Sequence, residues 1–280
     1  MTQKESENFQ GNVIGIGSDF PGAGLSSITS RMAEFLGVNP ERDIISLSRF
    51  ARAIVAEATS RNLIRETSPE AWDNFANELS NLYYQDAIIT SWNDKDVPEK
   101  NLKAFNDTLG KIADEHPNTS TSLKSLPEII AVRMLRELIE SDDTPNNIII
   151  TGKLATLLEY IVPDFPELAN GYIKILLQID PEIGANRVLQ REIALGERKN
   201  PKTEKSRLNI IKKLANITKE RIIFDWKEYA KVYKILTQDL PVEMSNLYET
   251  ADIKIKTTRL SEQDVFAQLA YYIAHRPPAA

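Results

Sequence analysis

The sequence contains no cysteine and only two histidines. Disulfide bonds and metal sites built from thiolates are therefore excluded, because both need cysteine sulfur. The two histidines, His116 and His275, are too few to form a histidine metal cluster on their own. The lack of cysteine is compatible with a reducing compartment, and we expect a cytoplasmic protein.

Long apolar runs are missing as well. No run approaches the roughly 20 consecutive apolar residues that a membrane-spanning helix needs, so we expect no membrane as a partner. Residues 1–10 are polar and lack the apolar core of a signal peptide. We expect this N-terminal segment and the proline-containing tail, 276–280, to be disordered.

The chain also lacks a strong excess of either charge. A net charge of −6 over 280 residues gives no electrostatic reason to expect DNA or RNA as a partner. Hydrophobic residues make up 42% of the chain, which is enough for a sizeable core. The length suits one α/β domain with insertions, and we place this single domain at 11–275.

Short apolar segments alternate with helical patterns along the chain. The segments with the length and composition of buried strands are 13–17, 43–47, 147–152, 172–179 and 252–257. Amphipathic helices are expected at 26–36, 49–61, 126–139 and 260–274. This alternation predicts an α/β fold with a parallel sheet and helices on both faces. The last strand alternates apolar and polar residues and is expected near an edge of the sheet.

A glycine-rich loop connects the first expected strand to the first expected helix. Residues 18–24 read Ser-Asp-Phe-Pro-Gly-Ala-Gly. Such a loop can turn several backbone N–H groups toward one anion, and the helix N-terminus adds partial positive charge. Parallel sheets bind ligands at the carboxyl ends of their strands, where this loop is expected to lie. The loop is therefore a candidate phosphate site.

The phosphate-loop pattern G-x-x-x-x-G-K-[ST] fits this loop only in part. In the register from Asp19 to Ser26, Gly24 and Ser26 match the pattern. Asp19 stands in the place of the first glycine, and Leu25 stands in the place of the lysine. A tight strand–helix turn that binds no ligand is therefore the alternative interpretation of the same residues.

Two arginines open the helix that follows the second expected strand. Arg49 and Arg52 are expected in the first turn of the helix 49–61, where a positive charge opposes the helix dipole. An anion in the cleft between strand ends would explain this placement. A solvated basic pair is the alternative.

The segment 187–221 is strongly basic. It contains eleven Lys or Arg residues against four Glu, a balance of +7 in a chain of net charge −6. A solvated helix face is the usual explanation of such a run. A basic, glycine-interrupted helical flap after a strand also fits a lid that closes over phosphates. We favour the lid, because the same sheet carries the glycine loop.

Several segments together resemble the cytidylate kinases, especially their archaeal-type branch, which belong to the P-loop nucleoside monophosphate kinases. These segments are VIGIGSDFPGAGLSS at 13–27, ISLSRFAR at 45–52, IIITGKLA at 148–155, RVLQRE at 187–192, Arg221 before Tyr229, and ADIKIKTTRLSEQDV at 251–265. The resemblance covers 11–275 in pieces. It implies a three-layer P-loop kinase fold with a five-stranded parallel sheet, a helical region that binds the monophosphate (49–146) and a basic lid (187–230). Residues 82–122 have no clear counterpart, and we interpret them as an insertion.

The resemblance also implies an activity, the transfer of the γ-phosphoryl group of ATP to CMP or dCMP, with Mg²⁺ as cofactor. By this match, the donor phosphates would lie on backbone N–H groups of Gly22, Ala23, Gly24, Leu25, Ser26 and Ser27. The Ser26 hydroxyl would meet Mg²⁺. The acceptor phosphate would be held by Arg52 and Lys153. The charge of the transferring group would be neutralised by Arg187, Arg191 and Arg221.

The sequence departs from the family pattern at four positions. Leu25 replaces the phosphate-bridging lysine, and Thr151 stands where family members often have an acidic residue near magnesium. Lys153 replaces an arginine and lacks its bidentate fork, and Glu228 stands where a second lid arginine is expected. The alternative function is therefore a degenerate homologue, catalytically weak or inactive, that binds nucleotide as a regulatory or scaffold protein.

Overall fold

The computed structural model describes residues 12–65, 68–82, 101, 104–105, 107–108, 111, 135, 138–139, 146–152, 155–156, 172–237 and 251–275. Both predicted disordered ends, 1–10 and 276–280, lie outside the described residues. The same holds for most of the predicted insertion, 82–122, and for most of the predicted helix 126–139.

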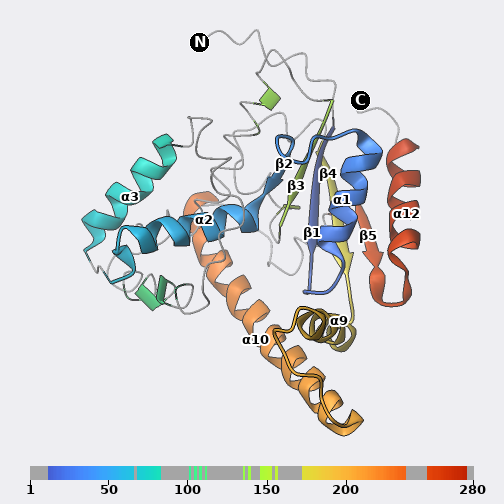
Figure 1. The fold of residues 1–280 in the computed structure, drawn as a ribbon. Coiled ribbons are helices and arrows are strands. Elements are labelled where there is room, and N and C mark those ends of the chain that lie inside the picture. Colours follow the sequence, from blue (N-terminus) through green and yellow to red (C-terminus); the bar gives the residue numbers. More distant parts are fainter. Residues whose placement is uncertain are drawn as a thin grey trace.

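Five parallel strands form one sheet, as the sequence predicts (Figure 1). The strands are β1 (Asn12–Ser18), β2 (Ile44–Ser46), β3 (Asn147–Thr151), β4 (Tyr172–Gln178) and β5 (Ile253–Lys256). Their order across the sheet is β2-β3-β1-β4-β5, so β1 lies in the centre and β5 lies at an edge. The glycine loop therefore leaves the sheet at its middle strand.

Helices cover both faces of the sheet. Alternate residues of the central strands, such as Ile14 and Ile175, pack in one core cluster with α1 (Leu25–Leu36) and α12 (Glu262–Ala274). These two helices lie side by side on that face (Figure 1). Residues of the opposite parity, such as Val13, are fully buried as well. Because successive strand residues point to opposite faces, burial of both sets means that neither face is open to solvent.

The remaining described elements are α2 (Leu47–Ser60), η2 (Leu63–Arg65), α3 (Pro69–Leu82), α9 (Pro181–Ala194), α10 (Glu204–Thr237) and η4 (Thr257–Arg259). Serine residues precede two of the helices, α3 and α12. The Ser68 hydroxyl accepts a hydrogen bond from the Ala71 N–H at 3.4 Å. Ser261 and Asp264 form a reciprocal capping box at the start of α12.

One predicted boundary was wrong in a way that matters for a candidate residue. Helix α2 begins at Leu47 rather than at Arg49. Arg49 still lies in the first turn, but Arg52 is the sixth residue and lies in the second turn. The helix dipole acts mainly within the first turn, so it gives no reason for the placement of Arg52.

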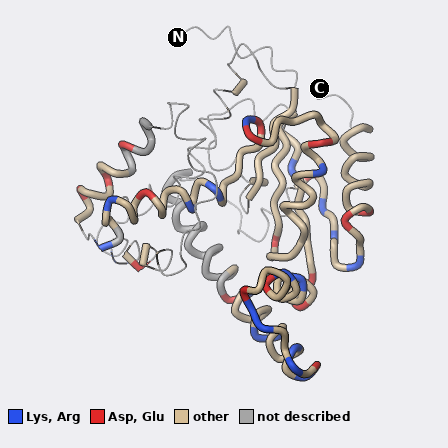
Figure 2. The backbone as a smooth tube through the Cα atoms, in the orientation of Figure 1, with Lys and Arg blue, Asp and Glu red and all other residues tan. Residues whose placement is uncertain are grey.

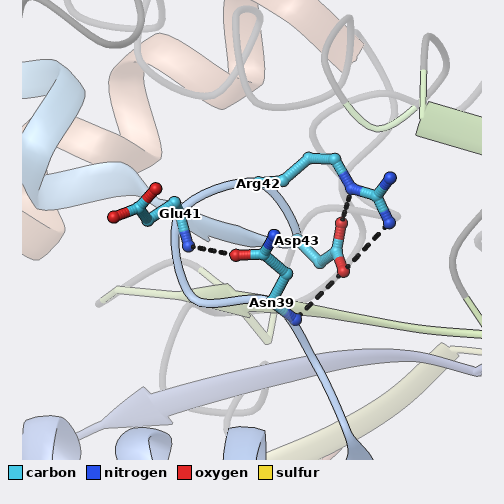
Figure 3. A network of polar contacts seen from close by, with 4 residues as sticks. All are labelled: Asn39, Glu41, Arg42 and Asp43. Atoms are coloured by element: carbon cyan, nitrogen blue, oxygen red, sulfur yellow. Dashed lines mark hydrogen bonds and ion pairs between the residues drawn. The ribbon is translucent and has the colours of Figure 1, made fainter.

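A compact polar network fixes the entry into β2, at the end of the sheet opposite the glycine loop (Figure 3). The buried Asp43 carboxylate accepts hydrogen bonds from Arg42 Nε at 2.5 Å and from the Asn39 N–H at 3.1 Å. The Asn39 side chain accepts from the Glu41 N–H at 3.0 Å. Since a buried carboxylate is costly without partners, this network explains how Asp43 is tolerated beside the core.

The basic segment predicted as a lid forms a helical hairpin. Helices α9 and α10 pack through a small apolar cluster of Ala185, Leu189, Ile211 and Ala215. The hairpin begins beside the carboxyl ends of the strands, and its tip extends away from the sheet (Figure 1). Within the described ranges, no helix has both the length and the apolar character that crossing a membrane requires.

Candidate phosphate-binding site

The glycine loop has the backbone geometry of an anion cradle. Gly22 and Gly24 have φ of 87° and 93°, a left-handed conformation that costs other residues about 1–2 kcal/mol. Gly24 is the N-cap of α1, and its carbonyl accepts from the Ile28 N–H at 3.0 Å. The N–H groups of the first helical turn have no acceptor inside the helix. They remain available to an anion placed at the loop.

The side chains of the loop add hydroxyls but no cation. Leu25 is half-buried and packs against the core cluster below the loop. Ser26 and Ser27 are exposed, and Ala23 is buried. The first basic residue of α1 is Arg31, which pairs with Glu262 at 2.9 Å on the α12 side. Charge stabilisation within the loop must therefore come from the backbone.

Arg187 on α9 is fastened to the loop. Its Nη1 donates to the Gly22 carbonyl at 3.2 Å, and its Nη2 donates to the Thr257 carbonyl at 2.9 Å. One half-buried guanidinium thus joins the loop, α9 and the chain directly after β5. The sequence predicts this side chain on the transferring phosphoryl group, whereas the structure places two of its donors on backbone carbonyls.

Two glycines bring α9 into direct contact with the loop. A Cβ built on Gly22 would lie 2.6 Å from the Gly184 carbonyl oxygen. A Cβ built on Gly184 would lie 2.6 Å from the Pro21 carbonyl oxygen and 2.7 Å from the Phe20 ring. Only two glycines allow this approach, so the first turns of α9 act as a support for the loop. Sequence reasoning missed Gly184, although a glycine inside a helix is itself a signal of close packing.

Asp19 was also missed as a structural residue of the site. Its Oδ1 accepts from the Ile179 N–H at 3.2 Å, and its own N–H donates to the Leu177 carbonyl at 3.1 Å. These bonds tie the start of the loop to the end of β4. Burial raises the pKa of the Asp19 carboxyl to about 6, and the hydrogen bond from Ile179 opposes this rise. When ionised, the carboxylate places a negative charge at the start of the loop.

Residues at the end of β5 are bonded to the residues at the end of β4, close to Asp19. The buried Thr257 hydroxyl donates to the Gln178 carbonyl at 3.1 Å. The Thr258 hydroxyl accepts from the Asp180 N–H at 3.0 Å, and Lys256 pairs with Asp180 at the same distance, 3.0 Å. The ends of β1, β4 and β5 are therefore linked by hydrogen bonds to one another and to α9.

The other predicted site residues are distributed more widely. Arg52 is exposed on α2, and Arg191 is exposed on α9, one turn beyond Arg187. Among the contacts of the described residues, none joins either side chain to the loop. Arg221 lies within α10, but its side chain is outside what the structure describes, and so is the whole of Lys153.

No model of a protein family matches the chain, and no curated protein matches its sequence. Across the described ranges, no three His, Asp or Glu side chains are grouped as a metal-binding cluster. The candidate site is therefore defined by its own geometry. It consists of a left-handed glycine loop, an open helix start and a supporting arginine.

The raised pKa of Asp19 leads to a pH-dependent prediction. A carboxyl whose folded pKa is raised stabilises the fold below its unfolded pKa, near 4, and this stability is lost as the pH rises through about 6. Asp19→Asn keeps the acceptor for Ile179 but cannot ionise. After allowance for solvent screening of a partly exposed group, we expect the variant to be more stable by about 1–2 kcal/mol at pH 8.

Denaturant unfolding at several pH values checks this prediction. At pH 4 the two proteins should have nearly equal free energies of unfolding, which makes low pH the internal control. The difference in the free energy of unfolding between the two proteins should appear between pH 4 and pH 7. If that difference is the same at all pH values, Asp19 is not the titrating group.

Proposed function

We propose that the protein is a nucleoside monophosphate kinase of cytidylate kinase type, which transfers the γ-phosphoryl group of ATP to CMP or dCMP. The observation that carries this proposal is the loop between β1 and α1. It combines two left-handed glycines with a helix start, whose first N–H groups have no acceptor inside the helix, at the carboxyl edge of a parallel sheet. The basic hairpin that starts beside the loop supports a lid.

The roles proposed for individual residues follow from the resemblance to the cytidylate kinases. Backbone N–H groups of residues 22–27 would bind the donor phosphates. The exposed Ser26 hydroxyl at the start of α1 fits one position in the coordination shell of Mg²⁺, which takes oxygen ligands and keeps waters and phosphate oxygens as the others. Bound Mg²⁺ would supply neutralisation of phosphate charge. Arg191 and Arg221 on the hairpin would add positive charge at the transferring group, and Arg52 and Lys153 would bind the acceptor.

Packing of Leu25 supports the second candidate function. A leucine held against the core cannot replace the lysine that bridges the donor phosphates, and loss of one such donor costs about 3–4 kcal/mol of transition-state stabilisation. Two of the five N–H donors of Arg187 are held by the Gly22 and Thr257 carbonyls, which keeps its guanidinium on the backbone in this arrangement. A degenerate homologue that binds nucleotide as a regulatory or scaffold protein accommodates both facts. For either function we propose the cytoplasm as the compartment, in keeping with the absence of cysteine.

Product formation decides between the two functions. ADP release is measured with Mg²⁺-ATP and each nucleoside monophosphate in turn, at high protein concentration. The kinase proposal expects turnover with CMP or dCMP above the rate without an acceptor. ATP binding without turnover for any acceptor would support the degenerate homologue, and absence of both would reject a nucleotide site.

The missing lysine can be restored. Because Leu25 is only half-buried, the stem of a lysine can occupy the same place while its ammonium reaches toward the loop. We expect Leu25→Lys to bind ATP more tightly and to raise any kinase rate, with a loss of stability below about 1.5 kcal/mol. Calorimetric titration with ATP and thermal melting of both proteins check this. A destabilised variant with unchanged ATP affinity would mean that the loop is adapted for packing.

Arg52 tests the acceptor side of the site. We expect Arg52→Ala to weaken CMP binding and to leave ATP binding nearly unchanged, because the residue lies on α2 and away from the loop. Stability should change by no more than about 0.5 kcal/mol, since the side chain is exposed. Arg49→Ala, one turn earlier on the same helix, tests the other arginine of the pair in the same way. Equal losses of CMP and ATP affinity would argue against a role in acceptor binding.

A further inference from the structure

Helix α10 presents a regular polar stripe that the kinase proposal does not use. The stripe consists of Lys205, Asn209, Lys212, Asn216 and Lys219, and all five side chains are exposed. Spacings of four and three residues place them on one side of a helix. Leu214, which packs against the apolar cluster between α9 and α10, lies on the opposite side of α10. The stripe therefore points away from the helix pair.

This stripe is positively charged and has no carboxylate within it. Residues 205–219 contain five Lys or Arg residues and no Asp or Glu. The nearby Glu204 pairs with Arg207, and Glu192 pairs with Arg198. Across the described part of the chain, no ion pair involves the three stripe lysines. Figure 2 shows the basic residues gathered on the part of the hairpin that lies farthest from the sheet.

A shallow hollow of about 380 Å³ lies at one end of the stripe. It is lined by Thr203, Lys205, Ser206, Asn209, Ile210 and Lys213. Most of these side chains carry hydrogen-bond donors, and two are cations. The hollow lies beside the stripe and adds a further cation, Lys213, to this surface.

The side chains of the stripe are those that contact phosphate and sugar in nucleic acids. Lysine neutralises phosphates, and Asn, Ser and Thr donate to them. No aromatic residue occurs in 181–220, so this surface offers no platform on which unpaired bases could stack. Asparagine both donates and accepts, which suits the ribose 2′-hydroxyl of RNA. A duplex that exposes phosphates and 2′-hydroxyls fits these properties better than a single strand does.

We propose that the outward face of α10 binds the backbone of double-stranded RNA. Lys205 to Lys219 spans about 21 Å of helix, at 1.5 Å per residue, so the stripe can follow the backbone of a duplex over several base pairs. In this arrangement the lysines contact phosphates and the asparagines between them contact 2′-hydroxyls. The whole chain is negatively charged, which argues against a nucleic acid partner, but the stripe on α10 is positively charged. RNA binding by this face does not depend on the proposed kinase activity.

Fluorescence anisotropy with a labelled 20-base-pair RNA duplex tests the proposal on the full chain. The variant K205E/K212E/K219E removes the stripe cations, and K205R/K212R/K219R is the matched control that keeps them. We expect the Glu variant to lose binding by about tenfold or more and the Arg variant to bind as the wild type does. The slope of log K against log salt should fall in magnitude by about 2.7, or 0.9 per lost cation. All variants should melt near the wild-type temperature.

Further arms of the experiment separate RNA from other polyanions. N209A/N216A should reduce the preference for the RNA duplex over a DNA duplex of the same sequence. Equal affinity of the wild type for both duplexes would overturn the assignment to RNA. Tighter binding of polyglutamate than of the RNA duplex would indicate an acidic protein partner and would also overturn it. The same holds if the Glu variant binds RNA as well as the wild type does.

Discussion

Replacing Gly22 with alanine is expected to lower the free energy of unfolding by about 3 kcal/mol and to abolish ATP binding. Two effects add at this position. The left-handed backbone costs a residue with a Cβ about 1–2 kcal/mol. The new methyl group would also lie 2.6 Å from the Gly184 carbonyl oxygen, and overpacking of this kind costs about 1–3 kcal/mol. To relieve the contact, the loop must move away from α9.

Gly24 provides a matched control for this substitution. Its φ, 93°, is nearly the same as that of Gly22, but a Cβ at Gly24 would meet nothing within 4 Å. Gly24→Ala should therefore show only the conformational cost, about 1–2 kcal/mol. Denaturant unfolding measures both variants. Equal losses for the two would show that the contact between α9 and the loop contributes little.

Replacing Arg187 with methionine is expected to lower the free energy of unfolding by about 2 kcal/mol. The reason is that the two hydrogen bonds of its guanidinium are lost, and hydrogen bonds to charged groups contribute about 1.5–3 kcal/mol. The methionine keeps most of the apolar stem but leaves the carbonyls of Gly22 and Thr257 without their donor. ATP affinity should fall together with stability, because the loop loses its support. Lysine at this position can reach one carbonyl at a time, so Arg187→Lys should recover part of both losses.

Arg191 separates support of the loop from phosphoryl transfer. This residue lies one turn further along α9 and is exposed, so Arg191→Met should change stability by no more than about 0.5 kcal/mol. If the kinase proposal holds, Arg191→Met lowers the turnover rate while ATP affinity is retained. If Arg187→Met shows that same pattern, with unchanged stability and ATP affinity, then Arg187 acts on the phosphoryl group and not on the loop.

Much of the architecture could be predicted from the sequence, because strands and turns are indicated by residues that lie close together in the chain. The apolar runs of the five strands and the glycines of the loop each predicted their element. The start of α2 was missed, because Leu47 belongs by composition to the preceding strand yet begins the helix. That shift moved Arg52 from the first turn to the second.

The interactions that hold the site together could not be predicted in the same way. Arg187 reaches the carbonyls of Gly22 and Thr257, 165 and 70 residues away in the chain, and a carbonyl acceptor leaves no mark in the sequence. The raised pKa of Asp19 depends on its burial beside the end of β4. Gly184 becomes significant only when α9 is placed against the loop. The resemblance suggested a phosphate ligand at position 187, whereas the packing shows a support for the loop.

The backbone N–H groups of residues 22–27 are expected to form an anion cradle. Amide NMR spectra of the isotope-labelled protein, recorded during titration with Mg²⁺-ATP, test this claim most directly. We predict saturable shifts of the amides of Gly22 to Ser27, with smaller changes at Asp19 and Arg187, and no such shifts in Gly22→Ala. Unchanged amides at 22–27 under saturating ATP, or shifts confined to another part of the chain, would contradict it.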